Sequence, residues 1–299
     1  MSMVWTLTLI TLNSKSKMLE ILLEYVNPMF EEKLAKYELP LELKYLAIVE
    51  SALNPNAISQ SGAGGLWQFM YPTGKQFNLE VTSYVDERYD PLQATEAACQ
   101  YLSSLYNIFG DWSLVLASYN AGPGNVSKAI RRSGGSQNYW NIRKNLPKET
   151  QGYVPAFLAT MYIYEYHKEH GIRPDRATIK HFATDTIMIK KQMSFAQISD
   201  LLDVPVTQLQ VMNPSYKLNV IPSYEDQNHF LRLPKDKIAV FASLYTLKKS
   251  FACDSSFTTV SASEYASSVF PEIVFKSLEV GSTSFSNDAL AVSCCVITS

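Results

Sequence analysis

Cysteine and histidine are scarce in this sequence of 299 residues, which contains four of each. Cys99 lies within an apolar helical pattern, which predicts a small buried core residue. Cys253 and the adjacent pair Cys294 and Cys295 lie in a polar C-terminal stretch. No C-x-x-C motif or cysteine–histidine spacing indicates metal ligands. The sequence therefore predicts no disulfide framework, no metal site and no cofactor.

Strong charge of one sign and long apolar runs are also lacking. The formal net charge of -2 gives no support for a nucleic-acid partner. The apolar residues 4–12 are too few to span a bilayer, and they lack the preceding basic residue and the following cleavage site of a signal peptide. We therefore expect either that the export signal is missing from this chain or that Met1 lies inside a longer precursor, whose N-terminal segment could carry a membrane or lipid anchor.

The remaining composition is typical of a globular protein, with 46% hydrophobic and 18% charged residues. The length allows one medium domain with its own core and a smaller unit besides. Pro40 is expected to open a helix, because the first helical position tolerates a missing N–H. Asp90 and Pro91 are predicted to begin a long helix that ends at Gly110, and Asp111 is predicted to cap the next one.

Glu50 opens the most informative stretch, residues 50–74, at the end of a predicted helix. It continues the helical stripe of Leu43, Leu46 and Ala47 that should face the core. A carboxylate there is costly unless it is neutral or hydrogen-bonded, and desolvation would raise its pKa, as a general acid near neutral pH requires. The alternative is a helix-end glutamate that simply reaches water.

A glycine-rich loop and an aromatic run follow. The step from Asn54 to Pro55 is expected to stop the helix, because the residue before proline avoids the α region. Glycines at 62, 64 and 65 let the backbone approach a ligand. Gln68 then stands among large apolar side chains, the composition of a sugar subsite. The alternative for Trp67 and Phe69 is ordinary core, and both interpretations can hold for alternate residues.

Three motifs along the chain resemble the signature of the lytic transglycosylases with a goose-lysozyme-like fold. The first comprises Glu50-Ser51, Ser59, Gly62-Ala63, residues 65–70 and Thr73-Gly74. The second, A-Y-N-A-G-x-G, falls on residues 118–124 with Ser118 in place of the usual alanine. The third, E-T-x-x-Y, falls on residues 149–153. The match covers residues 28–170 and is most similar to the membrane-bound lytic murein transglycosylase D type.

The resemblance implies a mainly α protein whose residues 39–175 form a lysozyme-like transglycosylase domain, preceded by a helical arm over residues 1–38. It implies that Glu50 first protonates the bond between N-acetylmuramic acid and N-acetylglucosamine. The same group would then accept the proton of the muramoyl C6 hydroxyl, giving a 1,6-anhydro product. The substrate-binding residues that it implies are Ser51, Ser59, Gln68, Met70, Tyr119, Asn120, Ala121, Glu149 and Tyr153.

Residues 184–234 read as strand, helix, helix and strand, an order that resembles the small α+β (βααβ) LysM module. Ser194 is the expected cap of the first of these helices. The family's Gly-Asp-Thr after the first strand is replaced by residues 191–194, which puts glycan affinity in doubt. From residue 239 to residue 299 the periodicity is lost, and we expect a linker or poorly ordered tail.

Two other functions stay open at this point. One is a lysozyme-like muramidase, in which water attacks the glycosidic bond, and the other is a non-catalytic protein that binds cell-wall glycan. Every one of these functions takes peptidoglycan glycan strands as the partner. The resemblance implies that the protein acts in the periplasm or the cell envelope of a Gram-negative-type bacterium. The sequence gives no indication of the oligomeric state.

Overall fold

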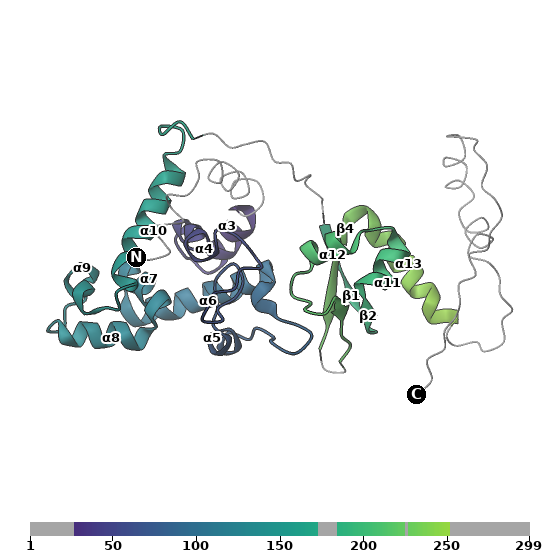
Figure 1. Cartoon of the computed structure of the whole chain (residues 1–299), viewed down its shortest axis with the longest axis horizontal. Helices are drawn as coiled ribbons and strands as arrows, with labels where there is room; N and C mark the ends of the chain where they lie inside the picture. Colours follow the sequence, from purple (N-terminus) through teal and green to yellow (C-terminus); the bar gives the residue numbers. More distant parts are fainter. Residues whose placement is uncertain (1–26, 173–183, 225–226, 252–299) are drawn as a thin grey trace. The chain divides into compact units, whose positions relative to one another are not determined.

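The computed structural model describes residues 27–172, 184–224 and 227–251 (Figure 1). The chain divides into a first compact unit that ends at Leu244 and a second that begins at Tyr245. The first unit holds an all-helical domain followed by a small strand-containing module. The elements of the helical domain are α3 (Asn27–Lys36), η2 (Leu41–Tyr45), α4 (Leu46–Ser51), α5 (Tyr71–Gln76), η3 (Glu87–Tyr89), α6 (Pro91–Phe109), α7 (Trp112–Ala121), α8 (Pro123–Arg132), α9 (Tyr139–Ile142), η4 (Arg143–Asn145) and α10 (Thr150–Glu165).

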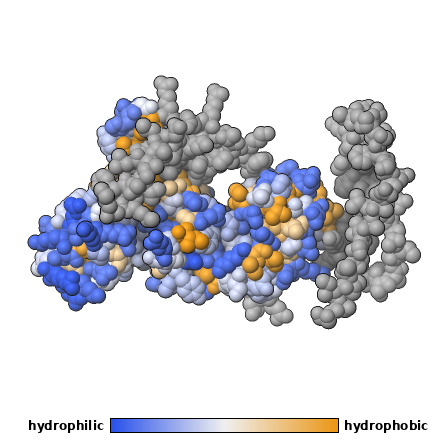
Figure 2. Space-filling model, in the orientation of Figure 1, coloured by the Kyte–Doolittle hydropathy of each residue, from blue (hydrophilic) through white to orange (hydrophobic). Residues whose placement is uncertain are grey.

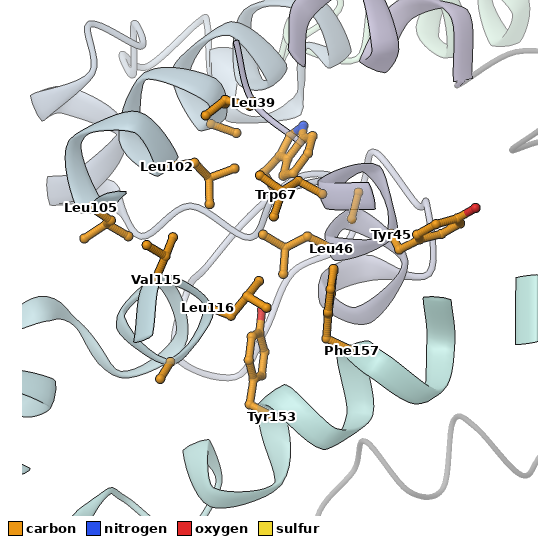
Figure 3. Close-up of a cluster of buried hydrophobic side chains, with 14 of the residues drawn as sticks. Leu39, Tyr45, Leu46, Trp67, Leu102, Leu105, Val115, Leu116, Tyr153 and Phe157 are labelled. Carbon is orange, nitrogen blue, oxygen red and sulfur yellow. The ribbon is translucent and has the colours of Figure 1, made fainter. Parts of the chain in front are cut away.

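The core of this domain lies where α4, α6, α7 and α10 meet (Figure 3). Leu46 of α4, Leu102 of α6 and Trp67 are fully buried there. Each such side chain contributes roughly 2 kcal/mol relative to an exposed one. Cys99 also belongs to this core, as predicted, and burial raises the pKa of its thiol to about 12. The site described below is therefore built on a packed helical frame.

The predicted helix boundaries around Gly110 are confirmed. Asp90 accepts hydrogen bonds from the first backbone N–H groups of α6, and Pro91 occupies the first helical position. Gly110 ends α6 with a φ of 63°, in the left-handed region that glycine adopts without strain. Asp111 then caps α7 through the N–H of Leu114. These local signals fix the turn between the two central helices.

Only the end of the expected N-terminal arm lies among the described residues. There, α3 is packed into the core: Phe30 and Leu34 are fully buried, and the Phe30 ring centroid lies 5.0 Å from that of Trp67. Residues 1–26 lie outside the described part. The extent of a separate arm stays a prediction.

The helix that carries Glu50 is shorter than expected. Pro40 precedes the 3-10 turn η2, and α4 then runs only from Leu46 to Ser51. Ala52 and Leu53 adopt left-handed φ angles of 52° and 59°, which ends the helix before the expected stop at Asn54. Ala52 thus acts as the C-cap of the helix: its backbone turns left-handed, while its N–H still donates to the carbonyl of Ile48.

The C-terminal module has the predicted order of strand, helix, helix and strand. Strand β1 (Thr184–Ile189) pairs antiparallel with β4 (His229–Pro234), and a short pair joins β2 (Met193–Ser194) to β3 (Val220–Ile221). Helices α11 (Phe195–Leu202) and α12 (Val206–Met212) lie between them in sequence. Ser194 caps α11 as predicted, in a capping box that Gln197 completes.

The structure differs from the expected linker where the module ends. Residues from 239 onward continue a helix, α13 (Lys235–Phe251), in which Phe241 is fully buried. Its weak amphipathic pattern explains why the sequence did not reveal it. The expected tail over residues 252–299 lies outside the described residues.

The surface of the described residues is mixed in character. Figure 2 shows hydrophobic residues in small separate groups among hydrophilic ones on the visible face. Among the described helices, none combines the length and the apolar character that crossing a lipid bilayer requires.

Candidate active site

Glu50 lies in the last turn of α4, on the stripe that buries Leu46 and Ala47. Its side chain is partly exposed, and its carboxyl group accepts a hydrogen bond from the Tyr153 hydroxyl. Desolvation raises the pKa of Glu50 to about 7; the negative charge of Glu149 adds to the rise and the bond from Tyr153 opposes it. At neutral pH both the protonated and the ionised form of this carboxyl group are present, so the group can give or accept a proton.

Tyr153 comes from the first turns of α10 and is 3% exposed. Burial and the nearby charge of Glu50 hold the pKa of its hydroxyl well above the usual value, so the group stays protonated and donates. Residues 50 and 153 meet because α4 packs against α10. Tyr153 therefore orients the Glu50 carboxyl group.

Tyr119 stands near the C-terminal end of α7, and its hydroxyl donates to the backbone carbonyl of Trp67 at 2.7 Å. Burial, with a contribution from the charge of Glu50, raises the pKa of this hydroxyl well above the usual value. The ring packs beside Phe69 and Tyr101, with centroid distances of 6.5 and 5.3 Å. In this structure Tyr119 thus ties α7 to the loop that follows Glu50.

That loop is folded back on itself by backbone hydrogen bonds. Gly64 and Phe69 exchange N–H···O bonds of 3.0 and 3.1 Å, and Gly65 donates to Ala57 at 2.9 Å. Gly65 has a φ of 80°, and a Cβ there would lie 1.7 Å from the carbonyl oxygen of Arg88. Only glycine fits this close approach of two backbone segments. We call residues 57–70 the catalytic loop.

Side chains alternate along the aromatic run of the catalytic loop. Trp67 and Phe69 are 0% and 2% exposed, so they are core residues. Gln68 is partly exposed, with a left-handed φ of 48°, and its amide donates to the carbonyls of Ala57 and Gly65. Met70 is 42% exposed. The core interpretation therefore applies to residues 67 and 69, while residues 68 and 70 are available to a ligand.

The two candidate serines shape the loop. The hydroxyl of Ser51 lies 2.9 Å from the Leu66 carbonyl oxygen and 3.0 Å from that of Ala47. The hydroxyl of Ser59 accepts the backbone N–H of Ala63 at 3.0 Å. The contacts of Ser51 with Leu66 and of Ser59 with Ala63 stabilise the catalytic loop, and a direct contact of either serine with substrate stays a prediction.

The remaining candidates come from the second and third motifs. Asn120 and Ala121 are partly exposed at the end of α7, and the Asn120 side-chain oxygen accepts the Thr150 hydroxyl at 2.7 Å. Glu149 is exposed at the N-cap of α10, whereas Tyr153, four residues on, is buried. Glu149 therefore acts on Glu50 through its charge rather than through a shared buried face.

Sequence reasoning missed a buried ion pair behind the catalytic loop. Arg88 donates from Nε and from Nη2 to the two carboxylate oxygens of Asp86, at 2.9 and 2.8 Å. Its Nη1 donates to the carbonyls of Gly62 and Phe69, at 2.9 and 3.1 Å. Asp86 and Arg88 are 1% and 9% exposed. The only sequence signal is an aspartate two residues before an arginine, a spacing that exposed turns share.

The site therefore consists of one desolvated glutamate, held by a tyrosine, in a helical domain with a glycine-rich loop. The profile of the transglycosylase SLT domain matches residues 28–142. The profile of the LysM-like domain of lytic transglycosylase MltD matches residues 183–250. The chain therefore contains an SLT domain and an MltD-type LysM-like module, the two domain types that these lytic transglycosylase profiles describe.

Curated relatives agree with this assignment. The membrane-bound lytic murein transglycosylase D of Escherichia coli (strain K12) is 34% identical over 204 residues, which are 67% of this chain and 44% of the relative. The soluble lytic murein transglycosylase of the same strain is 33% identical over 147 residues, 47% of this chain and 23% of the relative. The chain thus spans less than half the length of these relatives.

Among solved structures, this chain is similar to the 70 kDa soluble lytic transglycosylase of Escherichia coli. It is 32% identical, with a TM-score of 0.42 over 50% of this chain and 25% of that chain.

Proposed function

We propose that this chain is a peptidoglycan lytic transglycosylase that cleaves the β-1,4 bond between N-acetylmuramic acid and N-acetylglucosamine. The observation that carries the proposal is the environment of Glu50, whose desolvated carboxyl group has a pKa of about 7. The family assignment supports the choice of substrate. A pure glycan-binding protein has no need of such a desolvated and tyrosine-bound acid.

One carboxyl group suffices for this reaction. Glu50, initially neutral, protonates the glycosidic oxygen as the bond from C1 of the muramoyl residue breaks. The acetamido group of the substrate stabilises the developing positive charge at C1. The Glu50 carboxylate then takes the proton of the muramoyl C6 hydroxyl, and O6 bonds to C1. The proton returns to Glu50, no water is consumed, and the product carries a 1,6-anhydro ring.

Tyr153 supports both halves of this cycle. Its hydrogen bond stabilises the carboxylate form of Glu50 and opposes the effect of burial on the pKa. The balance keeps the group able to give a proton in the first step and to accept one in the second. Without that bond the pKa of Glu50 would rise further, and the carboxyl group would give up its proton less readily in the first step.

Gln68 and Met70 are proposed to line the sugar subsites, together with Ser51, Ser59, Asn120 and Ala121. The exposed Met70 offers an apolar surface, while the carbonyl end of the Gln68 amide is available as an acceptor. For Tyr119 we propose a contact with the substrate acetamido group in the complex. Glu149 is proposed to tune Glu50 by charge.

The hydrolytic alternative needs a second carboxylate. Inverting and retaining glycosidases place two carboxyl groups about 5 to 9.5 Å apart, one of them as base or nucleophile. Glu149 is the one described acid whose charge raises the pKa of Glu50, and it is exposed beside the start of α10. This setting favours the single-carboxyl reaction.

The relatives are bacterial murein enzymes, several of them named as membrane-bound, which indicates the cell envelope. We propose the periplasm as the compartment and glycan strands as the partner, with any anchor outside the described residues. The LysM-like module is proposed to keep its fold, while its altered first loop lowers its own affinity for N-acetylglucosamine chains.

Mass spectrometry of the products released from purified peptidoglycan tests the proposal. Anhydro-muropeptides from the native chain, and none from Glu50→Gln, are the expected result. Products heavier by one water would make the enzyme a muramidase and turn attention to Glu149. Bound glycan without any product would mean a binding protein.

A further inference from the structure

The LysM-like module contacts the helical domain within the first compact unit, through residues 215–217. The contact is made with residues 80–88, which we call the docking loop. The backbone N–H of Asp86 donates to the Ser215 carbonyl at 2.8 Å, and that of Lys217 donates to the Tyr84 carbonyl at 2.9 Å. The two segments thus pair as a short antiparallel bridge.

Side chains strengthen this contact. The Lys217 ammonium group donates to the Thr82 carbonyl at 2.7 Å and lies 3.6 Å from the Asp86 carboxylate. His229 of β4 lies 4.0 Å from the Glu80 carboxylate. Tyr216 is 8% exposed, and its hydroxyl is bound to the carbonyl of Phe230 within the module. Residues 215–217 are therefore anchored to the module through Tyr216 and make polar contacts with the docking loop.

The docking loop in turn holds the catalytic loop. Asp86 forms an ion pair with Lys217 and accepts hydrogen bonds from Arg88, and Arg88 donates to the carbonyls of Gly62 and Phe69. Those two carbonyls belong to the segment that carries the partly exposed Gln68. A continuous set of hydrogen bonds and ion pairs thus runs from the module to the loop proposed to bind sugar.

We propose that the LysM-like module is a positioning element for the catalytic loop, with Lys217 and Asp86 as positioning residues that act through Arg88. The expected effect on turnover rests on the proposed function, whereas the expected effect on the order of the catalytic loop does not. The module then assists turnover by holding residues 62–69 in place, whether or not it binds glycan itself. Neither residue touches the proposed reacting atoms.

The charges explain why Lys217 matters to Asp86. Asp86 is almost fully buried, and a buried carboxylate needs its partners because water cannot replace them. The Lys217 side chain is 37% exposed, so its loss is partly compensated by water and the backbone bridge remains. We therefore expect a graded loosening of the loop after its removal, with the fold intact.

Hydrogen exchange of the full chain without substrate tests this coupling. The amides of Gly64, Gly65 and Phe69 are bonded within the catalytic loop and report its opening. In Lys217→Ala these amides should exchange roughly threefold faster, the change expected from a partly exposed ion pair. Amides of α6 should keep their native rate. Lys217→Arg should restore slow exchange, and the exposed Lys235→Ala is the matched control.

Asp86→Asn provides the second variant. Because Lys217 is proposed to act through Asp86, adding Lys217→Ala to Asp86→Asn should change loop exchange no further. The same pattern is expected in kcat/KM for soluble glycan strands. Native exchange in the loop of Lys217→Ala, or equal acceleration in the loop and in α6, would overturn the inference. Failure of the native chain to cleave glycan would overturn the proposed function and leave the exchange result standing.

Discussion

Replacing Tyr153 by phenylalanine tests how the site sets the pKa of Glu50. The substitution removes one hydroxyl from a buried side chain and keeps the ring that packs in the core. A hydrogen bond to a charged group contributes about 1.5–3 kcal/mol, and one pKa unit corresponds to about 1.4 kcal/mol. Because the bond favours the carboxylate, its loss should raise the pKa of Glu50 by roughly one to two units.

The assay is the pH dependence of kcat/KM on soluble glycan strands. The native enzyme needs protonated Glu50 for its first step, so its activity should fall above a pH of about 7. In Tyr153→Phe the falling limb should move to a pH of about 8 to 9. The maximal rate should drop roughly ten- to hundredfold, because the carboxyl group loses its orientation.

Tyr162→Phe is the matched control for this prediction. Tyr162 lies on the same helix, α10, and is 50% exposed. Its hydroxyl has no role in the proposed site, and the control should keep the native profile. A limb that stays in place in Tyr153→Phe, or one that moves to lower pH, would refute the account of Glu50.

Three further substitutions follow from the same structure. Tyr119→Phe removes the bond to the Trp67 carbonyl and should lower kcat more than it raises KM; equal losses in rate and binding would argue against its proposed role. Gly65→Ala should destabilise the fold by about 1–3 kcal/mol in urea unfolding, because its Cβ would lie 1.7 Å from the Arg88 carbonyl, whereas Gly152→Ala, with no atom within 4 Å, should not; equal midpoints would contradict this. Glu50→Gln should raise the free energy of unfolding at pH 8 by up to about 3 kcal/mol and change little at pH 4. Between its unfolded pKa of 4.5 and its folded pKa of about 7, native Glu50 binds a proton only when folded, so stability is lost as the pH rises. An equal effect from the exposed Glu169→Gln would contradict that reasoning.

Much of the helical frame follows from local rules. Asp90, Gly110 and Asp111 combine capping chemistry with apolar periodicity, and such signals do not depend on distant contacts. The stripe that carries Glu50 was visible for the same reason. The end of α4 was not, because left-handed Ala52 and Leu53 carry no glycine or asparagine to announce the turn.

The polar network behind the site could not be predicted from sequence. Asp86 and Arg88 are charged residues in a stretch between helices, where exposure is the usual outcome. Their burial depends on a contact with Lys217, more than a hundred positions away in the chain, and on carbonyls that point inward from the catalytic loop. The partner of the Tyr119 hydroxyl is likewise a backbone atom, which no side-chain motif reveals.

The central claim is that Glu50 alone moves the proton while the substrate's own C6 hydroxyl replaces water. Cleavage of purified glycan strands in water enriched with oxygen-18, followed by mass spectrometry of the new chain ends, tests it most directly. The account predicts anhydro ends that contain no label from the native enzyme and no cleavage by Glu50→Gln. Reducing ends that carry one labelled oxygen would contradict it, because they would show that water attacks the glycosidic carbon.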